Sequence, residues 1–508
     1  MRHSFVVQMT LAVLAAGFIA GASAQIRPAP EQGAPRPAQQ QTGGKGLLRL
    51  LPADSVTEHA IDTPRGRLAY TATAGTLPFY DQSGEQSAAV FYTAYVAKDR
   101  DKSAGANRPL TFVFNGGPGA ASAFLHLGLV GPRILDPAAD AGDAAQMQLH
   151  DNPDTWLAFT DLVLIDPIGT GWSRTVKADD AKHFWSVRSD ADAMAKAIAL
   201  YVTRNDRAAS PKYLLGESYG GFRAAKTARA LQREQGIAVS GIVMLSPLIE
   251  GWLTFGDGGS ALHAALQLPS LAATELERNK AFNAQALAAA EKFAMTDYLT
   301  TLAGPPPQGD KAAAFYGRVA AISGLPVDTV ARARGFITGA YVKSLRAGKV
   351  VSHYDAAFAV DDPFPEQRSA RGPDPILDGV ARAYGGAFAN YARNELGFKT
   401  EMTYTLLAND VTGHWNWGKG GRLSVGAEND LRVLLAFSPR FRLLIAHGVS
   451  DMVTPYAMTR YLLDHMPPTD PPGRAELKLY RGGHMLYLDP QSRKAFSDDA
   501  AAFYRTAE

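Results

Sequence analysis

The sequence feature that most limits the fold is a glycine-rich turn, residues 216–221, which directly follows the short apolar run 213–215. The residues after the turn, 222–233, carry apolar and small side chains at helical spacing. A strand that bends sharply into a helix leaves little room at the bend, and glycines stand two positions before and two after Ser218. The pattern predicts a nucleophile elbow that exposes the Ser218 hydroxyl at a helix N-terminus. A chance turn is the alternative, so the prediction requires a histidine and an acid elsewhere.

Two later loops supply these partners. Asp451 and His484 each follow an apolar run that predicts a strand. The order Ser218, Asp451, His484 is the order found in α/β-hydrolases, where loops beyond the strand ends converge on one point. We therefore predict that Ser218 attacks an acyl carbon, His484 transfers the proton, and Asp451 holds the imidazolium. His447 stands near Asp451, but it precedes a loop glycine and we expect it to be structural.

The wider pattern predicts an α/β fold. The apolar runs and the alternating stretches expected as strands lie at 56–73, 88–97, 110–114, 161–166, 213–215, 242–245, 441–445 and 477–480. Helical stretches such as 184–203 separate the later strands. This alternation predicts a doubly wound, mostly parallel sheet of the α/β-hydrolase type, preceded by antiparallel strands.

Residues 251–400 interrupt the alternation with Ala- and Leu-rich helical stretches such as 279–302. We predict a helical cap inserted over the carboxyl edge of the sheet, where ligands bind in such folds. An independent domain is the alternative. The hydrolase core would then comprise residues 46–250 and 401–508.

The composition narrows the function classes. The chain has 508 residues and a net charge of +2, without a basic stripe, so nucleic acid is not an expected partner. It contains no cysteine, which excludes disulfides, Cys-ligated metals and lipid anchors on Cys. No His, Asp and Glu set has metal-ligand spacing, so we expect neither a metal nor another cofactor. The oligomeric state stays open.

The first residues resemble a secretory leader. Arg2 and His3 precede the apolar stretch 11–20, and Ala22-Ser23-Ala24 forms a cleavage site before Gln25. The apolar stretch is shorter than the ~20 residues that span a bilayer. We predict a signal peptide over 1–24, a disordered linker over 25–45 that is rich in Pro, Gln and Gly, and an exported protein, periplasmic or secreted, with no membrane anchor after cleavage. The lack of cysteine favours the periplasm.

A second glycine-rich turn, residues 115–119, follows the predicted strand at 110–114. Acyl transfer through Ser218 forms an oxyanion, which requires preorganised N–H donors. In this fold one donor is the residue after the nucleophile, and the other lies in a turn after an earlier strand. We therefore predict an oxyanion hole formed by the N–H groups of Tyr219 and Gly117.

Several segments together resemble the serine carboxypeptidase family, peptidase family S10. The motifs are Asn115-Gly116-Gly117-Pro118-Gly119, Asn152-Pro153-Asp154-Thr155-Trp156, Gly169-Thr170-Gly171-Trp172-Ser173, Gly216-Glu217-Ser218-Tyr219-Gly220, Gly448-Val449-Ser450-Asp451 and Gly483-His484-Met485. The resemblance implies an α/β-hydrolase that removes C-terminal residues from peptide substrates. It also implies that Asn115 and Glu217 bind the free carboxylate of the substrate.

The chain departs from the family pattern at one position of that carboxylate site. Family members often have a second Glu where this chain has Leu129. A serine hydrolase is therefore more firmly predicted than exopeptidase specificity. The alternatives are an esterase or acyltransferase on the same triad and a non-catalytic, exported binding protein, although a binding role has no use for all three triad residues.

Overall fold

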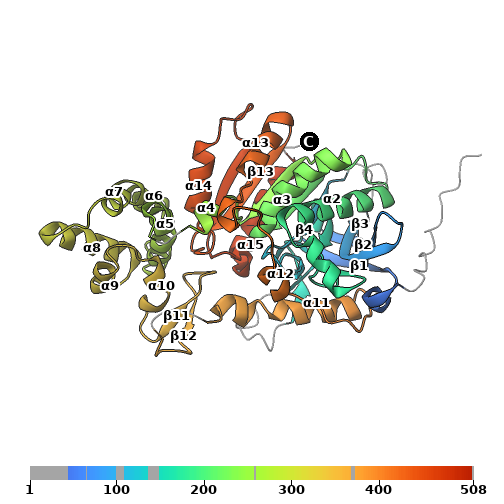
Figure 1. Ribbon diagram of the computed structural model, residues 1–508, viewed down its shortest axis with the longest axis horizontal. Helices are drawn as coiled ribbons and strands as arrows, with labels where there is room; N and C mark the ends of the chain where they lie inside the picture. Colours follow the sequence, from blue (N-terminus) through green and yellow to red (C-terminus); the bar gives the residue numbers. More distant parts are fainter. Residues whose placement is uncertain are drawn as a thin grey trace, which may run out of the picture. The chain divides into compact units, whose positions relative to one another are not determined.

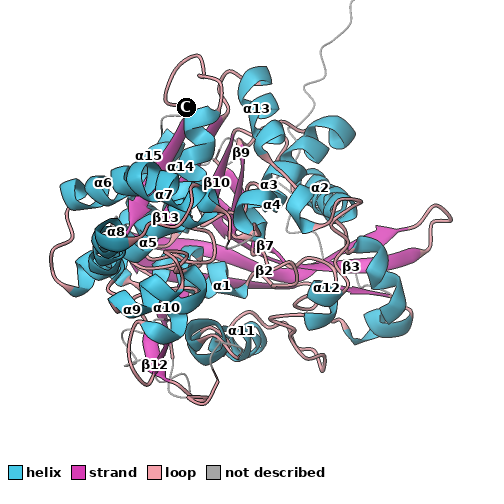
Figure 2. Ribbon diagram, turned by 60° about the vertical axis from the view of Figure 1, so that its left-hand side comes forward, coloured by secondary structure: helices cyan, strands magenta, loops and turns pink. Residues whose placement is uncertain are grey.

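The computed structural model describes residues 44–64, 66–98, 108–135, 148–256, 259–367 and 372–505. The predicted signal peptide, 1–24, lies outside the described residues, and so does the predicted linker except for its last two positions. Within the described part, a twisted ten-stranded sheet forms the centre of the molecule, with helices on both faces (Figures 1 and 2).

The sheet has the strand order β1-β2-β3-β7-β4-β9-β10-β13-β14, with the short β8 paired to β3. Strands β7, β4, β9, β10, β13 and β14 run parallel to their neighbours in that series, whereas β1, β2 and β3 form an antiparallel edge that joins β7. The bounds are β1 Ser55–Thr63, β2 Gly66–Tyr80, β3 Gln86–Ala97, β4 Leu110–Phe114, β7 Asp161–Ile165, β8 Arg174–Thr175, β9 Lys212–Glu217, β10 Gly241–Leu245, β13 Arg442–Gly448 and β14 Ala475–Tyr480. The stretch predicted as strand at 56–73 is thus a hairpin, with its turn after Thr63.

Two short hairpins lie outside this sheet. Strand β5 (Arg133–Leu135) pairs with β6 (Leu149–Asp151), and β11 (Lys349–Val351) pairs with β12 (Ala359–Asp361).

The helices are α1 Ala123–Leu125, α2 Val187–Arg204, α3 Tyr219–Ala230, α4 Gly251–Thr254, α5 Ala261–Arg278, α6 Ala284–Phe293, α7 Leu299–Ala303, α8 Gly309–Ser323, α9 Val327–Arg332, α10 Thr338–Ser344, α11 Ala383–Asn394, α12 Asn409–Gly413, α13 Glu428–Phe437, α14 Tyr456–His465 and α15 Pro490–Arg505. Side-chain caps set several starts. The Ser186 hydroxyl accepts the N–H of Ser189 at 3.1 Å, which explains why α2 begins at Val187 rather than at residue 184. The Asn283 side chain caps α6 in the same way.

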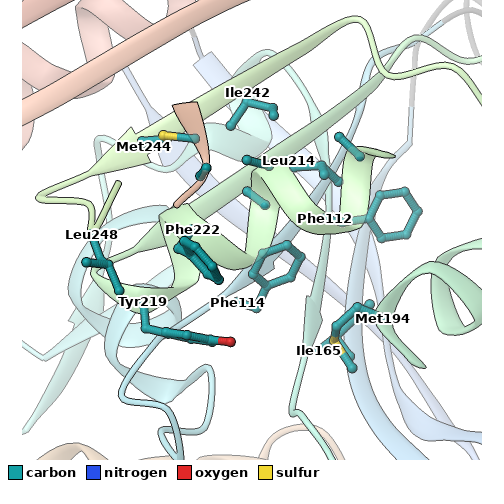
Figure 3. Packing of buried hydrophobic residues seen from close by; sticks show 14 of the residues in the cluster. Phe112, Phe114, Ile165, Met194, Leu214, Tyr219, Phe222, Ile242, Met244 and Leu248 are labelled. Atoms are coloured by element: carbon teal, nitrogen blue, oxygen red, sulfur yellow. The ribbon is translucent and has the colours of Figure 1, made fainter. Parts of the chain in front are cut away.

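The central strands are buried on both faces, and this explains their continuous apolar runs. Successive side chains of a strand point to opposite faces. Ile242 and Met244 therefore pack into the cluster with α2, α3, α13 and α14, whereas Val243 and Leu245 pack into the cluster with α11 and α15. Figure 3 shows the first of these clusters, in which strand residues such as Phe112 and Leu214 lie beside Phe222 of α3.

Helices α5 to α10 have a hydrophobic cluster of their own, separate from the two sheet clusters. Its buried members include Leu268, Phe293, Tyr298, Val330 and Tyr341. This group is not isolated from the sheet, because Leu266 and Ala273 of α5 belong to a sheet cluster. Figure 1 shows these helices gathered beside α14. These helices lie within the range 251–400 for which the sequence predicts a helical cap.

The later part of the predicted cap packs differently. Tyr384, Phe388 and Tyr391 of α11 are buried in the sheet cluster that also contains α15, and they do not belong to the α5 to α10 cluster. Within the range 251–400, the last buried member of the α5 to α10 cluster is Ala356. Helix α11 therefore packs as part of the sheet core, although it lies before residue 400.

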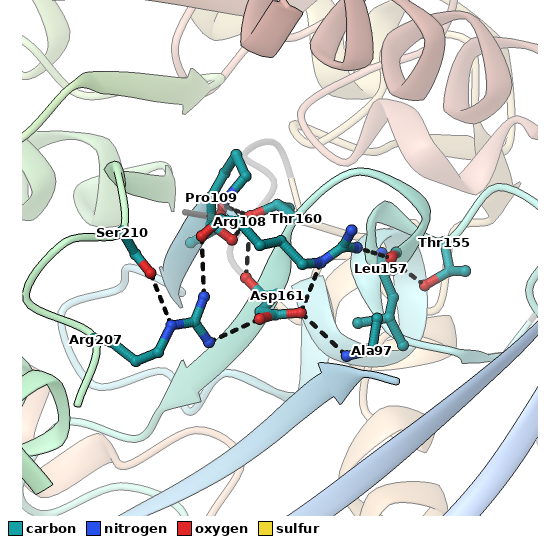
Figure 4. Close-up of polar contacts among 10 residues, drawn as sticks. Ala97, Arg108, Pro109, Thr155, Leu157, Thr160, Asp161, Arg207 and Ser210 are labelled. Carbon is teal, nitrogen blue, oxygen red and sulfur yellow. Dashed lines mark hydrogen bonds and ion pairs between the residues drawn. The ribbon is translucent and has the colours of Figure 1, made fainter. Parts of the chain in front are cut away.

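The amino end of strand β7 is fixed by a buried ion network (Figure 4). The Asp161 carboxylate accepts hydrogen bonds from Arg108 Nε at 2.8 Å and Arg207 Nη1 at 2.7 Å, and from the N–H of Ala97 at 3.1 Å. Arg207 also donates to the Ser210 hydroxyl. A buried ion pair is stable only when its polar atoms all have hydrogen-bond partners. These contacts therefore hold the amino end of β7 in place, at the edge of the sheet opposite the candidate site.

None of the helices in the described ranges is both long enough and apolar enough to cross a membrane.

Candidate active site

Ser218 occupies the sharp bend between β9 and α3. Its backbone has φ 60° and ψ −125°, a strained combination for a residue with a side chain. Ser218 N–H donates to the carbonyl of Leu245 at 2.9 Å, and its own carbonyl accepts the N–H of Leu248 at 3.1 Å. A Cβ at Gly216 would overlap the carbonyl oxygen of Gly220, and a Cβ at Gly220 would lie 2.6 Å from the carbonyl oxygen of Phe114, so the bend requires both glycines. The predicted elbow is the local structure that forms.

Asp451 and His484 meet beyond the ends of β13 and β14. His484 Nδ1 lies 2.9 Å from Asp451 Oδ2, and both side chains are buried. Burial alone raises the pKa of Asp451, but the facing His484 and several hydrogen bonds outweigh it and hold the pKa below its ordinary value. Burial alone lowers the pKa of His484, but the charge of Asp451 outweighs it and raises the pKa above its ordinary value. The pair is thus arranged to stabilise an imidazolium.

Thr454, three residues after Asp451, completes this arrangement. Its hydroxyl donates to Asp451 Oδ2 at 2.8 Å, and its N–H donates to Asp451 Oδ1 at 3.0 Å. The N–H of Val453 donates to the same Oδ1 at 2.7 Å. The carboxylate of Asp451 therefore has its oxygens fixed in direction, and it holds the ring of His484 through Nδ1.

One cavity of 130 Å³ brings the predicted site residues together. Its polar lining includes Asn115, Gly116, Gly117, Glu217, Ser218, Tyr219, Thr454 and His484. Its apolar lining includes Phe124, Leu248, Phe255, Tyr354, Leu377, Leu407, Val453 and Met485. Of the residues predicted as site residues, Asp451 alone is absent from this lining, because it lies behind His484.

The predicted oxyanion donors lie in this cavity beside Ser218. Tyr219 is the first residue of α3, and the first N–H groups of a helix have no acceptor within the helix. Gly117 belongs to the turn after β4 and has φ +100°, a conformation that favours glycine. A Cβ at Gly116 would lie 2.5 Å from the nitrogen of Tyr219, so Gly116 allows this turn to approach the elbow.

Asp166 fixes the segment that follows this turn. Its Oδ1 accepts the N–H and the hydroxyl of Ser122, both at 2.8 Å, and the Tyr404 hydroxyl at 3.2 Å. Asp166 lies at the end of β7 and is fully buried. It anchors the segment that follows the glycine-rich turn and does not line the cavity.

Glu217 and Asn115 are in direct contact. Asn115 Nδ2 donates to Glu217 Oε2 at 2.7 Å, and Asn115 Oδ1 accepts the N–H of Leu125 at 3.0 Å. Both side chains are buried. Burial raises the pKa of Glu217 to about 7, against the opposing effects of His484 and of hydrogen bonds from Tyr487 and Asn115. A neutral carboxyl is therefore a major form of Glu217 near neutral pH.

Leu129, at the position of the second family Glu, is fully buried in a sheet cluster and does not line the cavity. Glu217 instead receives a hydrogen bond from the hydroxyl of Tyr487, at 3.0 Å. Neither Tyr487 nor Thr454 is among the residues predicted from the sequence. Each follows a predicted triad residue by three positions, but no motif in the sequence marks either of them.

Tyr354 is a third residue that the sequence analysis missed. Its ring meets the ring of His484 edge to face, with centroids 5.1 Å apart, and its carbonyl accepts the N–H of His484. Tyr354 comes from the segment between β11 and β12, far from His484 in the sequence. No local motif marks it, since only the fold brings the insertion onto the histidine loop.

His447 is also close to the pair but has a different role. Its Nε2 bonds to the Thr459 hydroxyl at 2.8 Å, and burial lowers its pKa to about 4. His447 is thus a neutral, buried side chain that does not line the cavity. Within the described ranges, no cluster of three or more His, Asp or Glu side chains has a geometry that could hold a metal ion.

A model of the serine carboxypeptidase family matches residues 69–251, a range that includes Asn115, Glu217 and Ser218. Over this matched range, the chain belongs to the serine carboxypeptidase family. This is a family of hydrolases. A curated member, the pheromone-processing carboxypeptidase KEX1 of Yarrowia lipolytica, is 30% identical over 150 residues, which are 29% of this chain and 22% of that protein. The match thus spans less than a quarter of the curated relative.

A solved structure extends the likeness to the fold. The prohormone-processing carboxypeptidase KEX1(delta)P of Saccharomyces cerevisiae is similar with a TM-score of 0.54, over 86% of this chain and 91% of that one, at 14% identity. At this identity the likeness shows the fold alone. It confirms the predicted α/β-hydrolase fold with a mixed, mostly parallel sheet.

Proposed function

We propose that this family member is a serine carboxypeptidase that removes the last residue of a peptide through an acyl-enzyme on Ser218. The observation that carries the proposal is the joint presence, in one cavity, of Ser218 and His484 with the buried pair Glu217 and Asn115. A serine and its base cleave acyl bonds of many kinds. A neutral carboxyl and an amide beside them favour a substrate that ends in a free carboxylate.

In the proposed reaction, Ser218 Oγ attacks the last peptide carbonyl while His484 Nε2 accepts the hydroxyl proton. Asp451 stabilises the imidazolium through the bond to Nδ1. The N–H groups of Gly117 and Tyr219 bind the oxyanion. His484 then gives its proton to the leaving amine, which departs as the free C-terminal amino acid. Water attacks the acyl-enzyme by the same route in reverse and restores Ser218.

Glu217 and Asn115 would hold the carboxylate of the leaving residue. Two carboxylates repel when both are ionised, so Glu217 must be neutral to donate a hydrogen bond. Its raised pKa, about 7, supports this role, because the neutral form is available without a strongly acidic medium. His484 must be neutral at the same time to act as a base.

The cavity lining supports a preference for substrates with apolar side chains. Glu217 and His484 are the acidic and basic side chains among the lining residues, and both are committed to the roles above. A lysine side chain of the substrate would lose hydration without finding a free carboxylate. We expect a blocked dipeptide that ends in leucine to have a KM about tenfold lower, or more, than one that ends in lysine.

The test compares a blocked dipeptide with its C-terminal amide and identifies the products. Release of the last amino acid from the free acid, with a clear preference for the acid, supports the proposal. Equal turnover of acid and amide would instead favour the esterase or acyltransferase alternative on the same triad. Turnover of neither compound by the intact protein would favour a binding protein.

Ser218→Ala should abolish nearly all activity in the same assay, because no other group is proposed to form the acyl-enzyme. A serine-directed phosphonylating reagent should label the parent protein at Ser218. Ser189→Ala, a change on the surface helix α2 that retains Ser218, is the matched control and should be labelled like the parent. Labelling of another serine in the parent would refute the assignment.

A further inference from the structure

Tyr487 contributes to the candidate site from the loop that follows His484. It is fully buried, and its hydroxyl donates to Glu217 Oε2 at 3.0 Å. Asn115 Nδ2 donates to the same oxygen at 2.7 Å. The direction of the Asn115 amide is determined, because its other end accepts the N–H of Leu125. Glu217 Oε2 therefore faces two donors at once.

This arrangement decides which oxygen of a neutral Glu217 carries the proton. An oxygen that accepts from two N–H or O–H groups is poorly placed to hold a hydrogen of its own. The proton of neutral Glu217 consequently belongs on Oε1. Glu217 lines the cavity with Ser218, and Oε1 is the oxygen left for a ligand. If Oε2 accepted from one donor instead of two, the preference of the Glu217 proton for Oε1 would be weaker.

We propose that Tyr487 is a positioning residue that directs the proton of Glu217 toward the terminal carboxylate of the substrate. The inference rests on the proposed carboxypeptidase function and deepens it. Tyr487 would act through Glu217 and need not touch the substrate. It would supply the second contact to Glu217 in a chain that has Leu129, turned into the core, at the position of a second acid.

The packing around the Tyr487 ring holds this side chain in a fixed position. A Cβ at Gly128 would overlap ring carbons of Tyr487 and would lie 3.3 Å from the hydroxyl of Tyr384. Gly128 therefore leaves the space that the ring occupies. Because a Cβ at Gly128 would meet the ring of Tyr487 and not Glu217, Gly128→Ala should displace the Tyr487 ring without touching Glu217 itself.

The charged and titratable groups around Glu217 determine the sign of the pH effect. His484 lowers the pKa of Glu217, Asp451 raises it, and Tyr354 is a further buried titratable neighbour. The hydrogen bond from Tyr487 lowers the pKa of Glu217, because it stabilises the ionised carboxylate more than the neutral acid. Removal of the hydroxyl should therefore raise the pKa of Glu217.

The experiment measures KM and kcat against pH for the parent and Tyr487→Phe, on a blocked dipeptide and its amide. In the variant, KM for the acid should rise about fivefold below pH 7, as expected for one lost hydrogen bond. The alkaline rise of that KM should move to higher pH. For the amide, KM should not change, since it presents no carboxylate. Gly128→Ala should reproduce the loss of affinity for the acid.

Tyr504→Phe is the matched control, because Tyr504 is also buried and bonds to Thr111, and neither residue lines the cavity. This variant should leave KM for both substrates, and its dependence on pH, unchanged. An unchanged KM and pH profile for the acid in Tyr487→Phe would overturn the role of Tyr487. Equal rises of KM for the acid and the amide would also overturn this role, because they would indicate a general structural effect. A parent enzyme without preference for the acid would instead overturn the proposed function itself.

Discussion

Replacement of Glu217 by glutamine is the sharpest test of the carboxylate site. Glu217→Gln keeps the size of the side chain and an acceptor for the donors of Asn115 and Tyr487, but it cannot ionise. The pKa of Glu217 is raised by burial from its ordinary 4.5 to about 7. The folded parent thus binds a proton in a pH range where the unfolded chain has released it.

The sign and size of the stability effect follow from this difference. The contribution of Glu217 is fully favourable below pH 4.5, and it is lost as pH rises through about 7. Relative to the variant, the parent should lose about 3 kcal/mol of unfolding free energy between pH 4 and pH 8. Urea unfolding of both proteins at several pH values measures this change.

The effect on substrate binding has its own magnitude. With a pKa of about 7, about one-tenth of Glu217 is neutral at pH 8. The KM of the parent for a blocked dipeptide acid should therefore be about tenfold higher at pH 8 than at pH 6. In Glu217→Gln this rise should be absent. The acid limb of kcat/KM should also move to lower pH, because the charge of Glu217 raises the pKa of His484 in the parent.

Glu275→Gln serves as the control. Glu275 is buried in α5, bonds to Arg278 and Asn279, and does not line the cavity. Its replacement should leave the dependence of KM on pH unchanged. The reasoning is refuted if parent and Glu217→Gln give parallel KM curves for the acid and equal stability changes between pH 4 and pH 8.

Two further predictions concern the triad acid and the amino terminus. Asp451→Asn should lower kcat about 10⁴-fold, because the wrong tautomer of His484 then faces Ser218. Thr454→Val removes one hydrogen bond to Asp451 and should lower kcat only about tenfold. Steady-state kinetics measure both losses, and equal losses would contradict a smaller role for Thr454. If the protein is exported as we propose, amino-terminal sequencing of the mature form from the producing cell should begin at Gln25, and a mature form that begins at Met1 would contradict the signal peptide.

The parts of the fold that could be predicted are those with strong local signals. Strands β4, β7, β9 and β10 are buried on both faces, so each is a continuous apolar run in the sequence. The elbow is local at Gly216, where a Cβ would overlap the carbonyl oxygen of Gly220, four positions further on. Gly220 is instead required by the tertiary structure, because a Cβ there would overlap the carbonyl oxygen of Phe114 in β4. The insertion was harder to delimit. Helix α11 has the same helical spacing as the cap helices, and only its packing against the sheet cluster distinguishes it.

The order of Ser218, Asp451 and His484, each after a strand, sufficed to nominate these three residues, because parallel strands carry their following loops to the same edge of the sheet. The contacts that tune them depend on the tertiary structure. The Tyr487 hydroxyl reaches Glu217 across 270 positions of sequence, and the Tyr354 ring meets His484 from within the insertion. Burial of Glu217, which raises its pKa, is likewise a property of the packed site. Such effects arise from distance and dielectric surroundings in three dimensions, which no spacing along the chain encodes.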